Sequence, residues 1–258
     1  MKITLITGGS SGLGFELARC YLKDGNNVLL VSKNEERLNK AKARLEEEFT
    51  NMSIDVFALD LSKTDELSKL LDYTKEKGYF VNNLANCAGF GDQCDFKDMN
   101  INKQIDMTNV NCNALLYFTR VYLDDMLKNN EGHIINACSI AGFLPGPYMS
   151  TYHATKGYVL LLGEAISHEI RKTKVKVLTL CPGPFDSNFV VLAHNDYTFK
   201  KIKPISAEAV ARFGYKKSLK GKSLAVVGAK NRLTIFATRL FSRKFITKAS
   251  SNSTKKNG

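Results

Sequence analysis

The chain has 258 residues, of which 44% are hydrophobic and 24% charged, a composition typical of an ordinary soluble globular protein. No apolar run reaches the roughly 18 to 20 residues of a membrane span, and strand-like residues follow directly after Lys2, so we expect neither a membrane-spanning helix nor a signal peptide. Scattered cysteines without a CxxC pair and dispersed histidines predict no metal site and a reducing, cytoplasmic environment.

Apolar runs alternate with segments of helical periodicity from the first residues onward. The predicted strands are 2–7, 27–32, 54–59, 83–86, 133–138, 176–180 and 223–228, and the predicted helices lie near 12–24, 34–49, 63–77, 101–128, 151–173 and 206–219. Runs such as VLLV lack polar alternation, as expected of strands buried on both faces. The pattern predicts an α/β fold with a doubly wound, seven-stranded parallel sheet of the Rossmann type. We expect a single domain over residues 1–228, followed by a basic extension over 229–258.

The segment TGGSSGLG joins the first predicted strand to the first helix and allows two interpretations. Gly8-x-Ser10-x-Gly12 is the nucleophile elbow of a serine hydrolase, whereas Gly8-x-x-x-Gly12-x-Gly14 is a turn that holds a dinucleotide pyrophosphate. A hydrolase needs an oxyanion-hole loop from an earlier strand, and only one strand precedes Ser10, so we favour the dinucleotide. The start of the following helix would then face the phosphates with free N–H groups, and Ser10 and Ser11 can add hydroxyl donors.

Three further side chains have a spacing that suits acid–base chemistry. Ser139 follows a predicted strand at its carboxyl end, where parallel sheets bind ligands. Tyr152 and Lys156 are four residues apart at the start of a predicted helix and therefore share one face. An ammonium group near a phenol lowers the phenol pKa, which favours catalysis near neutral pH. Each residue alone also suits a structural role: Ser139 as a helix cap, Tyr152 as a partly buried aromatic residue and Lys156 as a solvated lysine. The prediction of acid–base chemistry therefore depends on the spacing of all three.

On these motifs the chain resembles the short-chain dehydrogenase/reductase family over residues 2 to about 228. The family motif TGxxxGxG matches Thr7 to Gly14, and NAG matches Asn86, Ala88 and Gly89, with Cys87 where a second asparagine is common. Asp60 and Leu61 match the pair that borders the adenine in this family, and Asn111 matches its catalytic asparagine. The S-x12-Y-x3-K set corresponds to Ser139, Tyr152 and Lys156. The PGxxxT/S segment corresponds to Pro182, Gly183 and Ser187. Thr155 stands where serine is usual before the lysine.

The resemblance implies an oxidoreductase that interconverts a carbonyl and an alcohol. Tyr152 would exchange the proton, and Lys156 would lower the tyrosine pKa and hold the nicotinamide ribose. Ser139 would bind the substrate oxygen, and Asn111 would position a water that links Lys156 to solvent. The implied dinucleotide site consists of Gly8, Ser10, Ser11, Gly12, Leu13, Gly14, Ser32, Lys33, Asn34, Arg37, Asp60, Leu61, Asn86, Ala88, Gly89, Tyr152, Lys156, Pro182, Gly183 and Ser187.

The end of the second predicted strand bears on the choice of cofactor. An acidic residue there would bind the ribose 2′-hydroxyl of NAD(H) and repel a 2′-phosphate, but this chain has Ser32, Lys33 and Asn34. Lys33 stands where NADP-using family members often carry arginine, and its charge suits a phosphate. We therefore predict NADP(H) over NAD(H), with a solvated surface lysine as the alternative.

The segment 184–204 covers the substrate in this family. Its Phe185, Phe189, Val190, Val191 and Leu192 would form an apolar lid, opposite Leu144 and Met149. This favours a hydrophobic ketone, aldehyde or alcohol as substrate, although a loop packed on its own core would have the same composition. The family commonly forms dimers and tetramers, so a homo-oligomer is expected.

The C-terminal part of the chain carries the excess positive charge. The net charge is +12, and 13 Lys and Arg but no Asp or Glu follow residue 208. Residues 229–248 mix apolar and basic side chains, which suits contact with an anionic membrane or a terminal helix packed on the domain or on a second subunit. No nucleic-acid-binding motif is present, so no such partner is expected. The final SSNSTKKNG predicts disorder.

Two other functions stay open. One is a regulator that binds a dinucleotide without catalysis, against which the intact set of Asn111, Ser139, Tyr152 and Lys156 argues, because binding alone does not need it. The other is a serine hydrolase that uses Ser10.

Overall fold

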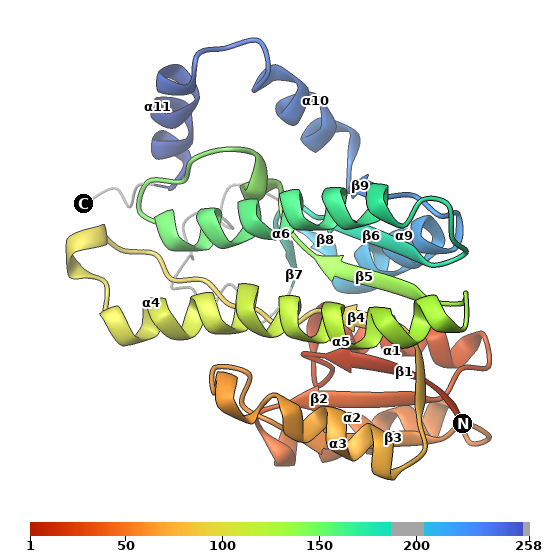
Figure 1. The fold of residues 1–258 in the computed structure, drawn as a ribbon. Coiled ribbons are helices and arrows are strands. Elements are labelled where there is room, and N and C mark those ends of the chain that lie inside the picture. The colour runs from red at the N-terminus through yellow and green to blue at the C-terminus, as the bar shows by residue number, and fades with distance from the viewer. Residues whose placement is uncertain (187–203, 255–258) are drawn as a thin grey trace.

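The computed structural model describes residues 1–186 and 204–254, except for the side chain of Ser253. Within this part of the chain lies a seven-stranded sheet of order β3-β2-β1-β4-β5-β6-β9, in which every neighbouring pair is parallel (Figure 1). Its strands are β1 (Lys2–Thr7), β2 (Val28–Ser32), β3 (Ile54–Ala58), β4 (Phe80–Asn86), β5 (His133–Ala137), β6 (Lys176–Cys181) and β9 (Leu224–Val226). The predicted doubly wound fold in a single domain is confirmed.

Helices cover both faces of the sheet (Figure 1). One face packs against α1 (Gly12–Lys23), α2 (Glu35–Glu48) and α9 (Ala207–Leu219), and the other against α3 (Ser68–Glu76), α5 (Leu115–Lys128) and α6 (Ser150–Glu169). Along β2, Val28 and Leu30 belong to the first core, and Leu29 and Val31 to the second. All four side chains are fully buried, which explains why this strand has no polar alternation.

The helix predicted over 101–128 consists of three parts. These are α4 (Ile101–Thr108), a π-helical turn η3 (Asn109–Ala114) and α5. Shorter helical turns are η1 (Thr64–Glu66), η2 (Phe96–Asp98) and η4 (Ile140–Phe143). The π-helical turn has wider hydrogen-bonded turns than an α-helix, a feature often found at functional sites, and it contains Asn111.

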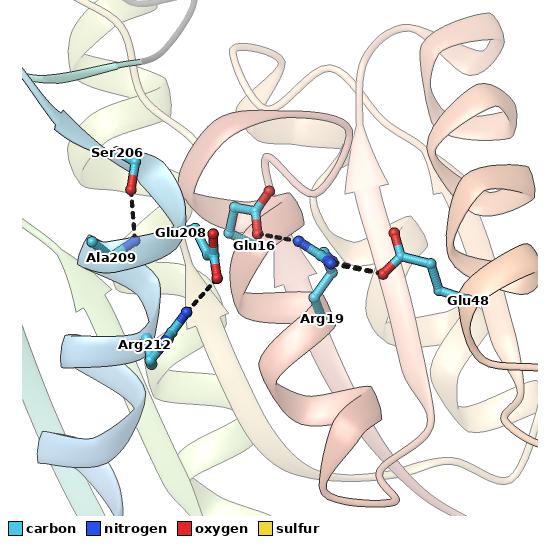
Figure 2. A network of polar contacts seen from close by, with 7 residues as sticks. All are labelled: Glu16, Arg19, Glu48, Ser206, Glu208, Ala209 and Arg212. Carbon is cyan, nitrogen blue, oxygen red and sulfur yellow. Dashed lines mark hydrogen bonds and ion pairs between the residues drawn. The ribbon is translucent and has the colours of Figure 1, made fainter.

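Polar contacts at the surface of this layer join α1 to α2 and lie within α9 (Figure 2). Arg19 of α1 donates to Glu16 of the same helix at 3.1 Å and to Glu48 of α2 at 2.9 Å. In α9, Ser206 caps the first turn by accepting from the amide of Ala209 at 3.2 Å, and Arg212 pairs with Glu208. Exposed pairs of this kind each contribute about 0 to 1 kcal/mol, so they add little to the stability of the fold.

A separate two-stranded parallel sheet lies beside the main one. It pairs β7 (Phe185–Asp186) with β8 (Ile205–Ser206) and so brings together the two ends of the segment 187–203. Phe185, predicted to be part of an apolar lid, is partly buried against the core beneath α1 and α9. The other predicted lid residues, Phe189 to Leu192, and Ser187 lie outside the described residues.

Beyond β9 the chain forms α10 (Ala229–Ala237) and α11 (Arg243–Thr254), which lie outside the two helix layers (Figure 1). The last turn of α11 includes residues 250–254, for which the sequence predicted disorder. Thr254 is 7% exposed; its hydroxyl donates to the carbonyl of Pro147 at 2.8 Å, and the Gln93 side chain donates to its carbonyl. These contacts to two loops explain why the helix continues so far. No helix in the described residues is long and apolar enough to cross a membrane.

Candidate active site

The turn between β1 and α1 packs tightly against the segment that follows β4. The hydroxyl of Thr7 accepts from the amides of Cys87 at 3.1 Å and Ala88 at 3.2 Å. Gly8 has a φ of +67°, and a Cβ there would lie 2.9 Å from the Ala88 nitrogen, so only glycine suits this position. The strand order reverses between β1 and β4, and this is the place at which open parallel sheets bind their ligands.

The first turn of α1 is suited to an anionic group. Its N-cap residue Ser11 makes no side-chain capping bond, whereas Asn34, Asn100 and Ser206 cap α2, α4 and α9. A Cβ at Gly14 would overlap the carbonyl of Gly8, so the turn and the helix need this glycine to approach each other. Uncapped N–H groups at the positive end of a helix dipole bind phosphate oxygens well. The turn therefore fits the pyrophosphate of a dinucleotide.

The end of β2 lies next to this turn and carries a positive charge. Ser10 donates to the hydroxyl of Ser32 at 3.2 Å, which connects the glycine-rich turn to β2. Lys33 is exposed and acts on Asp60 beyond β3. Burial raises the pKa of Asp60, but hydrogen bonds from Ser62 and the charge of Lys33 outweigh it and lower the pKa. A cation at this edge of the sheet suits an anionic ligand group.

Other residues of the predicted dinucleotide site have contacts within the fold. The side-chain oxygen of Asn34 accepts from the amide of Arg37 at 2.8 Å, and Arg37 is exposed. Leu61 is buried in the core beneath α3 and α5, and Leu13 is buried in the core beneath α1. Asn86 is 2% exposed, and its amide donates to Thr119 at 3.0 Å and to Asn136 at 2.9 Å. Asn86 thus connects β4 to β5 and α5, a role that its motif position did not indicate.

The structure brings Ser139, Tyr152 and Lys156 together at the carboxyl end of β5. Ser139 begins η4, accepts from the amide of Ala141 at 3.1 Å, and forms a hydrogen bond with the Tyr152 hydroxyl. In α6, the ammonium nitrogen of Lys156 lies 5.8 Å from the centre of the Tyr152 ring. Lys156 is 5% exposed and donates to the carbonyl of Ala137 at 2.8 Å. The predicted spacing therefore corresponds to one cluster, in which Lys156 is buried and Ser139 and Tyr152 are half-buried.

Burial dominates the titration of this pair. Burial raises the pKa of Tyr152, the hydrogen bond with Ser139 lowers it only in part, and Cys138 raises it further. Burial lowers the pKa of Lys156, although nearby thiols act in the opposite direction. The Tyr–Lys spacing predicted a lowered tyrosine pKa, but the net direction is upward because desolvation of the phenol is the largest effect. The phenol is therefore protonated at neutral pH.

Cysteines from four separate segments lie around Lys156. They are Cys87, Cys112, Cys138 and Cys181. The thiol of Cys138 donates to the carbonyl of Lys156 at 3.2 Å, and that of Cys112 to the carbonyl of Thr155 at 3.8 Å. Their spacing in the sequence suggested only scattered free thiols. Within the described residues, no group of His, Cys, Asp or Glu is arranged to hold a metal ion.

Asn111 connects the segment after β4 to the start of α6. It is 1% exposed, accepts from the Phe90 amide at 3.1 Å, and donates to the Phe90 carbonyl and the Thr155 hydroxyl, both at 3.0 Å. A Cβ at Gly89 would lie 3.0 Å from the Asn111 side-chain oxygen and 3.4 Å from the Lys156 ammonium nitrogen. The side chains of Asn111 and Lys156 thus both lie next to Gly89. Thr155, which stood out in the sequence only as a departure from the family motif, completes this arrangement.

The segment after β6 lies beside Ser139. The amide of Ile140 donates to the carbonyl of Pro182 at 3.0 Å, and a Cβ at Gly183 would lie 2.5 Å from the amide nitrogen of Asn231 in α10. Of the predicted substrate-side residues, Met149 is buried, and the carbonyl of Leu144 contacts the Nδ1 atom of His153 at 2.9 Å. The predicted site thus lies along one edge of the sheet, except for Ser187, which is not among the described residues.

Comparison with known proteins identifies the family. A family model described as short chain dehydrogenase matches residues 2–197, which is most of the chain. The chain belongs to the short-chain dehydrogenase family. An uncharacterized oxidoreductase of Staphylococcus aureus (strain USA300) is 30% identical over 210 residues, which cover 81% of this chain and 89% of that protein. The resemblance inferred from the motifs is confirmed, and the protein is an NAD(P)-dependent oxidoreductase of this family.

Solved structures of short-chain dehydrogenases have the same fold. The enzyme from Sphingobium yanoikuyae in complex with NADPH is similar with a TM-score of 0.83 and 22% identity, over 93% of this chain and 94% of that chain. A short-chain dehydrogenase/reductase from Burkholderia phymatum in complex with NAD is similar with a TM-score of 0.82 and 23% identity, over 100% and 98%. Family membership favours the dinucleotide interpretation of the glycine-rich turn over a serine hydrolase, and the two structures differ in their nucleotide.

Proposed function

We propose that this short-chain dehydrogenase is an NADP(H)-dependent enzyme that interconverts an apolar ketone or aldehyde and its alcohol, with Tyr152 as the proton donor and acceptor. The observation that carries the proposal is the cluster of Ser139 and Tyr152 around the buried Lys156. It lies at the same edge of the sheet as the uncapped first turn of α1. Glycines 8, 12 and 14, with Ser10 and Ser11, would hold the pyrophosphate.

Tyr152 has the properties of a proton donor to a carbonyl oxygen. A nicotinamide bound along this edge would supply the hydride. A phenol with the ordinary pKa of about 10 is protonated at neutral pH, and burial raises the pKa of Tyr152 further. The Ser139 hydroxyl accepts from the Ala141 amide and forms a hydrogen bond with the Tyr152 hydroxyl, so with substrate bound it would donate its proton to the same carbonyl oxygen as Tyr152. Such a donor stabilises the negative charge that develops on this oxygen during reduction.

Lys156 and Asn111 support the proton transfer. The ammonium group of Lys156 is fixed by the Ala137 carbonyl and stabilises the phenolate that Tyr152 becomes after it donates. The same group would hold the hydroxyls of the nicotinamide ribose. Asn111 and Lys156 both lie next to Gly89. Asn111 would position a water near Lys156, through which a proton returns from solvent.

The proposed preference for NADP(H) rests on the end of β2. Lys33 is exposed there, and no carboxylate follows β2 directly to bind a ribose 2′-hydroxyl. A 2′-phosphate would gain a charge-assisted contact with Lys33.

We also propose that residues 229–248 contact an anionic membrane surface. The protein is further proposed to form a dimer or tetramer in the cytoplasm. Exposed Leu116 on α5 and exposed Tyr158 and Leu161 on α6 support a contact with a second subunit.

A substrate screen tests the proposed reaction. NADPH oxidation is followed with ketones and aldehydes of graded chain length, and in parallel with NADH. We expect turnover that increases with apolar chain length and a lower KM for NADPH than for NADH. Binding of NADPH without turnover of any carbonyl would indicate the non-catalytic regulator instead. Ester hydrolysis that Ser10→Ala abolishes would indicate a serine hydrolase.

A further inference from the structure

The two C-terminal helices expose side chains that helices usually bury. We call residues 229–254, which contain α10 and α11, the C-terminal arm. In α11 the most deeply buried residues are small and polar, since Ser250 and Thr254 are 5% and 7% exposed, and Ile246 on the same side of the helix is half-buried. The aromatic residue of the same helix, Phe245, is 53% exposed. A surface helix normally turns its large apolar side chains toward the core, so the exposed ring of Phe245 is unusual.

The same arrangement continues through α10 and the connection to α11. Ile235 is buried against the domain, but the other large apolar side chains are exposed. These are Leu233 at 69%, Phe236 at 57%, Leu240 at 69% and Phe241 at 52%. The rings of Phe241 and Phe245 lie against each other, with their centres 4.9 Å apart. Exposed apolar residues that cluster in this way indicate a surface that another apolar phase covers.

The charge of the C-terminal arm restricts what can cover it. The arm contains six cations, namely Lys230, Arg232, Arg239, Arg243, Lys244 and Lys248, and no Asp or Glu. All six are exposed, and none forms an ion pair with a carboxylate of the described residues. Two copies that met through their arms would bring these like charges together. An anionic surface would neutralise them.

We propose that the outward face of the C-terminal arm, formed by Leu233, Phe236, Leu240, Phe241 and Phe245 with the six cations, binds the surface of an anionic lipid bilayer. Leucine and phenylalanine side chains enter the boundary between head groups and acyl chains, while lysine and arginine contact lipid phosphates. Neither helix crosses the bilayer, in agreement with their short length. The inference specifies the surface behind the proposed membrane contact and does not depend on the proposed reaction.

The anchored end of α11 fixes the arm relative to the active-site edge. Thr254 contacts Pro147 and Gln93, and Pro147 lies in the loop that leads from η4 to Tyr152 in α6. In Figure 1, α11 lies beside this loop, above α4. A bilayer bound to the arm would therefore lie near the loop that precedes Tyr152.

Vesicle flotation tests the proposal without cofactor or substrate, so its outcome is separate from that of the proposed reaction. The full chain is mixed with phosphatidylcholine vesicles or with vesicles that also contain phosphatidylglycerol. We expect flotation with the anionic vesicles only. Replacing the exposed rings in F241S/F245S, or two cations in R243Q/K244Q, should each weaken partition about tenfold or more.

Matched changes elsewhere serve as controls. Phe96 is 66% exposed and lies outside the arm, and Lys172 and Lys174 are exposed on the domain. Accordingly, F96S and K172Q/K174Q should float like the parent chain. Circular dichroism and thermal unfolding show whether each variant is folded.

Three results would overturn the proposal. The first is no flotation of the parent chain with anionic vesicles. The second is equal flotation of F241S/F245S and the parent. The third is dissociation of an oligomer by F241S/F245S, seen in sedimentation velocity, without a change in lipid partition, because the arm would then cover a second copy of the chain.

Discussion

Replacement of Asn111 by alanine should destabilise the protein as well as impair the reaction. The amide of Asn111 makes three hydrogen bonds in a site from which water is almost excluded. Asn111→Ala removes all three at once. The amide and carbonyl of Phe90 lose their side-chain partner, and the Thr155 hydroxyl loses a donor. The two segments that Asn111 joins, after β4 and at the start of α6, carry the proposed proton-transfer machinery.

The size of the effect follows from these contacts. A buried donor or acceptor left without a partner costs about 1 to 3 kcal/mol. Water that enters the space left by the amide would satisfy part of the demand, so we expect a net loss of about 3 kcal/mol in the free energy of unfolding. For a domain of this size, each kcal/mol lowers the thermal midpoint by about 2 to 4 °C. Asn111→Ala should therefore lower the midpoint by about 6 to 12 °C.

Thermal unfolding followed by circular dichroism measures this shift. The matched control is Asn113→Ala in the same π-helical turn, because Asn113 is exposed and its amide donates only to Asn109, at 2.9 Å. Its midpoint should stay within about 2 °C of the parent value, since exposed substitutions usually change stability by less than about 0.5 kcal/mol. Equal shifts for the two variants would refute the role given to the Asn111 contacts.

Two further predictions concern the cofactor and pH. Lys33→Ser should raise the Kd for NADPH about tenfold or more, because a charge-assisted contact is lost, and should leave the Kd for NADH nearly unchanged. Fluorescence titration measures both dissociation constants, and Lys63→Ser is the control. Equal effects on the two nucleotides would contradict the proposed contact of Lys33 with the 2′-phosphate. Burial lowers the pKa of His133 and of His153, so the unfolded chain binds protons more readily than the fold as the pH decreases below about 6.5. The thermal midpoint should decrease as the pH is lowered below this value, and it should decrease less in His153→Gln. A midpoint independent of pH would show that the histidines do not contribute to the pH dependence of stability.

The order of elements and the clustering of Ser139, Tyr152 and Lys156 could be predicted from the sequence for physical reasons. Strands buried on both faces have continuous apolar runs, and Val28 to Val31 show this directly. The four-residue spacing of Tyr152 and Lys156 places both on one side of a helix, and parallel strands end at a common edge, where Ser139 lies. Short-range periodicity therefore predicted most of the fold and the proximity of Ser139, Tyr152 and Lys156.

Features that depend on contacts distant in sequence were not accessible. The π-helical turn at Asn111 inserts no breaker residue, so the helical pattern on either side continues through it. The pKa of Tyr152 rises because the folded chain excludes water from the phenol, and spacing along the helix does not contain that information. Thr254 belongs to a segment that resembles a disordered tail in composition, but it contacts two loops more than 100 residues away in the sequence.

The central claim is that Tyr152 transfers the proton that accompanies hydride transfer. Single-turnover reduction of the best carbonyl substrate by bound NADPH tests it most directly, with Tyr152→Phe compared with Tyr158→Phe, a change of a more exposed tyrosine on the same helix. The account predicts that Tyr152→Phe slows the reaction by about 10² to 10⁴ while NADPH binding is retained, and that Tyr158→Phe has little effect. A Tyr152→Phe rate close to that of the parent enzyme would contradict the account.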